Sequence, residues 1–214
     1  GDAYSYNSLS ANTAPESSQN LELGARLDSA DKRYSTRLAA FRSTKLHERN
    51  TDPLVNLTTL SGKRHVAGAE FDISGRITPK WEVYGSYMWL PIANIDTPAY
   101  ERGRTGIALG ETGRPSLTPR YSGTLWTTYQ LTPQWRVGGG LNHRGAQSPE
   151  GNRNVLAPAF TTLDAMAEYS FSDATTLKFN VNNLSNKLYA DTLYRGFYGP
   201  GAPRTVQVSL KTLF

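Results

Sequence analysis

The sequence predicts an all-β protein: an antiparallel sheet that forms part of the wall of a transmembrane β-barrel. Three observations lead to this fold class. Apolar and polar residues alternate with a period of two through about nine segments, which is the pattern of strands with two different faces. Short and long connections alternate between these segments, as they do in barrels. No apolar run approaches the roughly 18 residues that a membrane-spanning helix needs.

The alternating segments are long enough to cross a membrane. Most contain about 11 to 15 residues, whereas strands of soluble sheets contain roughly 5–6 and tilted barrel strands need about 9–11. In one segment Trp81, Val83 and Trp89 share one face. Glu82 and Ser86 lie on the opposite face of the same segment. The predicted strands cover residues 18–28, 33–46, 62–75, 80–93, 117–131, 134–145, 159–171, 174–187 and 203–214.

The connections between the predicted strands alternate in length. In outer-membrane barrels the short turns face the periplasm and the long loops face outward, so we expect the same arrangement here. The short turns are predicted near residues 28–33, 75–80, 131–134 and 171–174, and the long loops near 47–61, 94–116, 146–158 and 188–202.

The odd number of predicted strands indicates a partial barrel. Bacterial single-chain barrels usually have an even number of strands. If the last strand ends in the periplasm, the first of about nine begins outside, so the chain would enter through an extracellular loop formed by residues 1–16. We therefore expect residues 1–214 to form the C-terminal part of one larger barrel domain.

A repeated turn motif supports this organisation. ITPKWEVYGSY at 77–87 and LTPQWRVGGGL at 131–141 share Thr-Pro-x-Trp-x-Val. The Thr-Pro pair fits a turn, and the following tryptophan would begin the next strand at the membrane interface, where amphipathic rings form girdles. The aromatic residues that we assign to the girdles are Trp81, Trp89, Trp135, Tyr169 and Phe171.

Charged residues lie on the strand faces opposite the apolar ones. A narrow barrel would have to pair them in a cramped interior, because an isolated buried ion is strongly disfavoured. A wide lumen that holds water or another polar domain accepts them easily. This set comprises Glu22, Arg26, Arg37, Glu70, Asp72, Glu82, Arg120, Arg136, Asp164, Glu168, Lys178 and Lys211.

Composition and motif content argue against several functions. The net charge of +5 comes from 23 Lys and Arg interleaved with 18 Asp and Glu, so we expect no nucleic acid partner. The absence of Cys removes zinc–thiolate clusters and thiol nucleophiles. His47, His65 and His143 are far apart in sequence, which favours isolated surface histidines over a haem or metal ligand pair. Because no catalytic triad order or phosphate loop is present, we expect neither an enzyme nor a bound metal or other cofactor.

Three segments resemble the C-terminal barrel of TonB-dependent siderophore receptors. Among these receptors, the closest resemblance is to the catecholate-type branch. The segments are VAGAEFDISGRITPKWEVYGSYMWL at 66–90, GRPSLTPRYSGTLWTTYQLTPQWRVGGGLNHRG at 113–145 and LDAMAEYSFSDATTLKFNVNNLSNKLYAD at 163–191. The most specific pieces are the NNLSNKLY stretch and the aromatic C-terminus. The resemblance runs from about Pro15 to Phe214.

The resemblance implies a barrel of about 22 strands with a plugged lumen, of which this chain would supply the last nine. Members bind a ferric siderophore from outside and move it inward when the inner-membrane energy-coupling protein TonB pulls on the plug. Neither the plug nor the N-terminal coupling motif is in this sequence, nor are the N-terminal barrel strands. The resemblance also implies that Phe214 is the sorting signal read by the barrel assembly machinery.

The candidate ligand-binding residues lie in the predicted outer loops. A ferric catecholate is a flat aromatic trianion, so arginine would supply charge-assisted hydrogen bonds and tyrosine or phenylalanine flat faces. The same arginines could instead bind lipopolysaccharide phosphate or pair with acids, and the tyrosines could belong to an outer girdle. The candidates are Tyr100, Arg102, Arg104, Arg114, Arg144, Arg153, Tyr194, Arg195, Phe197 and Tyr198.

These features favour an outer-membrane receptor for ferric siderophores. Its expected partners are the siderophore, TonB acting through the plug, the N-terminal strands and plug of its own barrel, and outer-membrane lipid and lipopolysaccharide. Other readings remain open at this point: a passive porin-like channel, TonB-dependent uptake of haem or a hydroxamate siderophore, and a secreted carbohydrate-binding β-sandwich.

Overall fold

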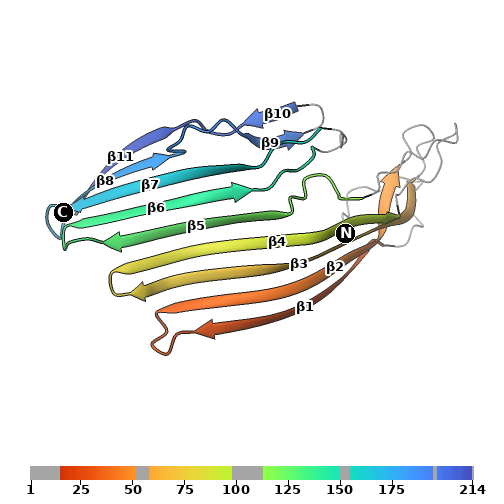
Figure 1. The fold of residues 1–214 in the computed structure, drawn as a ribbon, viewed down its shortest axis with the longest axis horizontal. Coiled ribbons are helices and arrows are strands. Elements are labelled where there is room, and N and C mark those ends of the chain that lie inside the picture. Colours follow the sequence, from red (N-terminus) through yellow and green to blue (C-terminus); the bar gives the residue numbers. More distant parts are fainter. Residues whose placement is uncertain (1–14, 52–57, 98–112, 150–154, 195–196, 214) are drawn as a thin grey trace.

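The computed structural model describes residues 15–51, 58–97, 113–149, 155–194 and 197–213. Within these ranges nine strands form one sheet in the order β1-β2-β3-β4-β5-β6-β7-β8-β11, and every neighbouring pair is antiparallel. The two remaining strands, β9 and β10, form a separate hairpin (Figure 1). No helix among the described residues has the length and apolar character needed to cross a membrane.

The nine predicted strands correspond one to one with strands of the large sheet, which confirms the all-β antiparallel fold class. Short turns lie at one end of the sheet and longer connections at the other (Figure 1). The strands are β1 (Ser17–Asp28), β2 (Tyr34–Thr51), β3 (Thr58–Thr78), β4 (Trp81–Thr97), β5 (Tyr121–Gln130), β6 (Trp135–Arg144), β7 (Phe160–Ser170), β8 (Thr175–Asn182), β9 (Ala190–Tyr194), β10 (Phe197–Pro200) and β11 (Thr205–Thr212).

Five predicted strand boundaries were wrong by more than three residues. β2 and β4 continue to Thr51 and Thr97 rather than ending at 46 and 93, and β3 begins at Thr58 rather than 62. The other two lie at residues with left-handed backbone. β5 begins at Tyr121 rather than 117, and Leu117 has a φ of 55°. β8 ends at Asn182 rather than 187, because Asn183 (φ 49°) and Asn186 (φ 50°) turn the chain. Asparagine tolerates this conformation better than most residues. The hairpin β9–β10 was also missed, since residues 188–202 were predicted as loop.

The sheet is a single layer with one apolar face. Leu23 on β1 is 81% exposed and Leu210 on β11 is 67% exposed, and both lie on this face. Among the described residues no large side chain is fully buried, so the sheet has no core of the kind that stabilises a soluble domain. An apolar face of this extent requires an apolar medium. β1 and β11 form the two edges, and the described residues do not close the sheet into a barrel.

The opposite face carries ion pairs between neighbouring strands. Arg37 on β2 contacts Glu22 on β1 at 2.6 Å. Arg76 contacts Glu82 at 2.8 Å across β3 and β4, and Arg136 contacts Glu168 at 3.2 Å across β6 and β7. The prediction that the charged residues of several strands share one face is therefore confirmed for these pairs. Some of these charges are neutralised within the wall itself.

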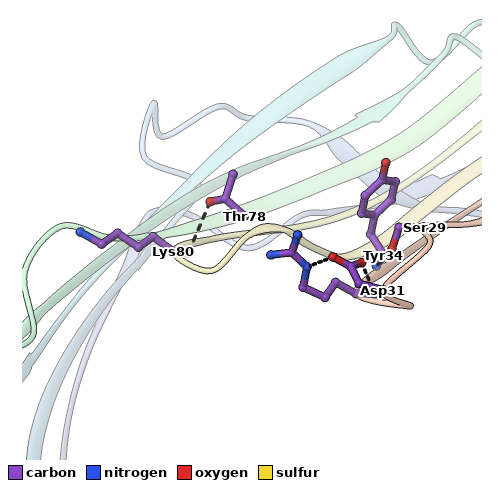
Figure 2. Close-up of polar contacts among 6 residues, drawn as sticks. Ser29, Asp31, Tyr34, Thr78 and Lys80 are labelled. Carbon is purple, nitrogen blue, oxygen red and sulfur yellow. Dashed lines mark hydrogen bonds and ion pairs between the residues drawn. The ribbon is translucent and has the colours of Figure 1, made fainter.

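Hydrogen bonds from short polar side chains shape the short turns. In the β1–β2 turn the Ser29 hydroxyl donates to Asp31 Oδ1 (2.7 Å), and the Tyr34 N–H donates to Ser29 Oγ (3.1 Å) (Figure 2). In the β3–β4 turn the Lys80 N–H donates to Thr78 Oγ1 (3.3 Å) (Figure 2). These bonds satisfy backbone donors where the strand ladder ends, so the turns stay short.

Two adjacent glycines of β6 differ in the space beside them: Gly140 lies on the polar face and Gly139 on the apolar face. A Cβ at Gly140 would lie 2.5 Å from the Trp126 ring and 2.6 Å from the Leu125 carbonyl oxygen, whereas one at Gly139 would meet nothing closer than 3.5 Å. We expect Gly140→Ala to destabilise the full-length barrel by about 1–3 kcal/mol, because the neighbouring strand must shift. Gly139→Ala should leave stability nearly unchanged.

The measurement is the temperature at which each variant loses the faster gel migration of a folded barrel. Equal midpoints for the two variants would show that the close approach of β5 and β6 at Gly140 does not exist.

Candidate functional site

A pocket of about 430 Å³ lies on the polar face, toward the end of the sheet that carries the longer connections. Its floor consists of two rows of side chains that cross four adjacent strands. In the first row, register places Ser86, Thr124, Asn142 and Thr162 directly opposite one another. In the second row the same register aligns the residues Met88, Ser122, Arg144 and Phe160. The floor thus offers hydroxyl and amide groups, one cation and one aromatic ring.

Tyr189 and Asp191 from the last loop also line this pocket. Arg144 Nη1 donates to the Asp191 carbonyl oxygen (2.8 Å), and Nη2 contacts its carboxylate (3.3 Å). The guanidinium also lies over the Phe160 ring at 5.2 Å from the centroid, while Phe160 packs on Tyr189 with centroids 4.2 Å apart. These contacts fasten the loop to the wall. Arg144, a candidate from the sequence, therefore lines this pocket, and both of its Nη atoms contact Asp191 of the loop.

Arg114 takes a structural position rather than one open to a ligand. One of its Nη atoms donates to the carbonyl oxygens of Leu90 (2.8 Å) and Pro91 (3.0 Å), and the other to that of Thr118 (3.2 Å). Burial of the guanidinium and, after it, the nearby charge of Arg120 lower the pKa of Arg114. The side chain ties the segment before β5 to β4.

A second, apolar pocket of about 420 Å³ lies between the last two outer connections. Phe197 and Tyr198, both candidates from the sequence, begin β10 and line it. Its other walls include Val155, Leu156 and Leu193, and no charged residue of the described ranges lines it. This pocket suits an uncharged, apolar group.

The remaining candidates are not placed in either pocket. For Tyr194 only the backbone is described, and it pairs with Phe197. Five further ligand candidates and the predicted assembly signal lie outside the described residues: Tyr100, Arg102, Arg104, Arg153, Arg195 and Phe214.

The aromatic residues assigned to girdles gather in part at the end with the short turns. Trp135 at the start of β6 contacts Tyr169 with ring centroids 4.8 Å apart, and Tyr169 contacts Phe171 at 4.9 Å. Trp81 begins β4 and donates from its indole to Thr127 Oγ1 (2.7 Å). Trp89 lies farther along β4, opposite Tyr121 at the start of β5.

Two of the described histidines, His65 and His143, each contact one polar side chain. His65 Nδ1 contacts the Asp96 carboxylate at 2.7 Å, and His143 Nδ1 lies 2.8 Å from Thr161 Oγ1. In the part of the chain that the structure describes, no group of three His, Asp or Glu side chains gathers as a metal site.

The family model of the "TonB dependent receptor-like, beta-barrel" matches residues 1–184. This chain belongs to that family. Its barrels are proteins of the bacterial outer membrane, which accounts for the apolar face of the sheet. The secreted β-sandwich is thereby excluded.

Curated relatives match almost the whole chain. A probable TonB-dependent receptor, BfrD of Bordetella pertussis, is 32% identical and matches 93% of the chain and 27% of its own length. The catecholate siderophore receptor Fiu of Escherichia coli is 31% identical over 89% of the chain and 25% of its own length. The chain thus spans about a quarter of these relatives.

Solved receptor structures share the fold. The siderophore receptor PiuA from Acinetobacter baumannii superposes with a TM-score of 0.82 at 27% identity, covering 91% of this chain and 28% of PiuA. The closed form of Fiu from Escherichia coli gives a TM-score of 0.79 at 26% identity, covering 94% of this chain and 28% of Fiu. The sheet therefore matches one segment of a larger receptor barrel.

Several pocket residues were not found by sequence reasoning. Ser86, Ser122, Thr124 and Asn142 were unremarkable as sequence, because each is one polar residue in an alternating strand. Their significance comes from register, which brings residues up to 76 positions apart, such as Ser86 and Thr162, into one row. Assigning each hairpin its turn length would have aligned these rows.

The Arg144 contact predicts a local effect on the loop. We expect Arg144→Ala to raise the rate of proteolysis within residues 188–202 by about fivefold, because an exposed ion pair of this type contributes roughly 1 kcal/mol. Arg204→Ala serves as control, since its guanidinium makes one long hydrogen bond of 3.5 Å to Leu184. Cleavage is followed by mass spectrometry on the full-length protein. Equal rates in both variants would contradict a fastening role for Arg144.

Proposed function

We propose that this chain is the C-terminal part of the barrel of an outer-membrane receptor that takes up ferric siderophores, with catecholate-type chelates as the substrate class. Transport would be driven by TonB acting on a plug inside the lumen. The relatives support the class, since one is a catecholate siderophore receptor and another a probable TonB-dependent siderophore receptor. The receptor would act without catalysis and without a cofactor of its own, with the ferric chelate as cargo.

The single observation that carries the proposal for this chain is the pocket bounded by two cross-strand rows and by Tyr189 and Asp191. Its hydroxyl and amide groups can bind the oxygen atoms of a chelate, and its aromatic rings match a flat catechol. The two rows place Arg144 within the floor, so an anionic ligand would meet a cation there. The predicted arginines outside the described residues would add to this charge.

Another class of metal chelate is supported by one relative and by the composition of the polar pocket. A metal-pseudopaline receptor, CntO of Pseudomonas aeruginosa, is 28% identical over 92% of this chain. The described part of the polar pocket holds more neutral than charged groups, which also suits a chelate of lower charge. TonB-dependent uptake of another metal chelate is therefore the alternative.

The partners we propose follow from the two faces and the two edges of the sheet. Outer-membrane lipid and lipopolysaccharide would cover the apolar face, and the plug would meet the polar face with its ion pairs. The N-terminal strands of the same barrel would pair with the edge of β1 and with the edge of β11. Backbone groups in lipid require such pairing.

Ligand binding to the full-length receptor tests the proposal. We expect tight binding of a ferric catecholate, weaker binding of a ferric hydroxamate, and a large loss of catecholate affinity when residues 188–202 are deleted, because the deletion removes Tyr189 and Asp191 from the pocket. Fluorescence quenching measures each affinity. Preference for the hydroxamate, or undiminished binding by the deletion variant, would argue against the substrate and the site.

Conductance in planar bilayers separates the receptor from a passive channel. A receptor with a plugged lumen should show little ion current without an energy source, whereas a porin would conduct steadily. Steady conductance would contradict the proposal.

A further inference from the structure

The stretch NNLSNK at 182–187 is the part of the family resemblance that neither pocket explains, and its central residue is Asn183. This side chain is 4% exposed, and its backbone is left-handed with a φ of 49°. Its amide has two donor hydrogens and an acceptor oxygen, and the structure uses all of them. Nδ2 donates to the carbonyl oxygens of Lys187 (2.9 Å) and Ala202 (3.0 Å), and Oδ1 accepts from the Lys187 N–H (2.8 Å).

These bonds close the base of the last outer loop. Lys187 directly precedes residues 188–202, and Ala202 lies at their end, so one side chain holds both ends of the loop together. Gly201 adds a backbone bond from its N–H to the Tyr189 carbonyl oxygen (2.9 Å). The loop therefore emerges from the sheet as a closed unit with a fixed base.

The same residue connects the loop to the floor of the polar pocket. The Asn183 N–H donates to Asp164 Oδ1 (2.8 Å), and Asp164 Oδ2 accepts from Asn142 Nδ2 (3.0 Å). Asn142 is part of the first row of the pocket floor. A continuous set of hydrogen bonds thus runs from the pocket floor through Asp164 and Asn183 to both ends of the loop.

We propose that Asn183 is a positioning residue for ligand binding: it fixes the loop 188–202 over the polar pocket. The inference rests on the proposed function for its ligand and deepens it by naming what sets the position of Tyr189 and Asp191. Asn183 acts through the loop and does not touch the ligand. Without its amide, Lys187 and Ala202 lose their shared partner, and the loop can shift relative to the floor while the strands stay paired.

Glycine is the substitution that isolates the amide. Asn183→Gly keeps the left-handed backbone without strain and removes only the side-chain bonds. Asn186→Gly is the matched control, because Asn186 also has left-handed backbone (φ 50°) and its Oδ1 accepts one bond, from the Arg204 N–H (2.9 Å), outside the loop.

The test uses the full-length receptor with a nitroxide attached at Thr192→Cys, an exposed position on β9. We expect Asn183→Gly to sharpen the electron paramagnetic resonance spectrum and to weaken ferric catecholate binding about tenfold, as loss of one net buried hydrogen bond would. The fraction of heat-modifiable, folded barrel should stay at the parental value. Asn186→Gly should leave the spectrum and the affinity unchanged.

Two results would overturn the inference. One is an unchanged nitroxide spectrum in Asn183→Gly; the other is a folded fraction that falls in step with binding, which would make Asn183 a residue of barrel assembly. The spectrum involves no ligand, so it decides whether Asn183 fixes the loop even if the parental receptor binds no ferric catecholate and the proposed function fails.

Discussion

The structure depends on one constraint, which is the antiparallel register of its strands, and from β4 to β7 this register runs without a bulge. In a one-layer sheet each residue faces either lipid or lumen, and a shift by one residue would exchange the two faces of a strand. The register from β4 to β7 places Ser86, Thr124, Asn142 and Thr162 in one row. The pocket floor is thus a consequence of strand pairing, and none of its residues is brought there by a separate structural element.

From β4 to β7 the polar face divides into two regions with different chemistry. Ion pairs such as Arg76–Glu82 and Arg136–Glu168 lie near the short turns, where β4 and β6 begin. Toward the other end the rows contain mostly hydroxyl and amide groups, with Arg144 as the cation of the pocket floor. In an ion pair between adjacent strands, each charge is neutralised by its partner. Uncharged hydroxyl and amide groups can instead donate hydrogen bonds to a ligand or accept them from it. The division supports binding at the outer end.

The sequence predicted the fold class and the strands but not the residues of the pocket floor, for a physical reason. Period-two alternation is local, so residues such as Trp81 and Glu82 reveal their faces without any knowledge of the rest of the chain. The end of β8 was misplaced because the polar run after Asn182 continues the alternation, while the left-handed backbone of Asn183 is set by bonds to Lys187 and Ala202. The site depends on which strands meet at which residue, and composition does not encode that.

Two of the arginine candidates make contacts within the protein, an alternative that the sequence left open. Arg114 donates to the backbone of β4, and Arg144 donates to Asp191. A guanidinium near the ends of strands can satisfy carbonyl groups that the strand ladder leaves unpaired, and an unsatisfied buried carbonyl is costly. At the outer end, these two arginines therefore hold neighbouring segments of the chain together.

The two attachments of the last loop differ in a way that fits a receptor. At its base the side chain of Asn183 is buried, and its bonds to Lys187 and Ala202 are between uncharged amide groups. At the pocket the contact of Arg144 with Asp191 is partly exposed and ionic, and such contacts weaken as ionic strength rises. An anionic chelate offers the same kind of oxygen acceptor as the Asp191 carboxylate, so under the proposed function it competes for the Arg144 donors. The bonds of Asn183 would keep the loop in place while the chelate replaces Asp191 at Arg144. Ligand binding would then change the Arg144–Asp191 contact and leave the base of the loop unchanged.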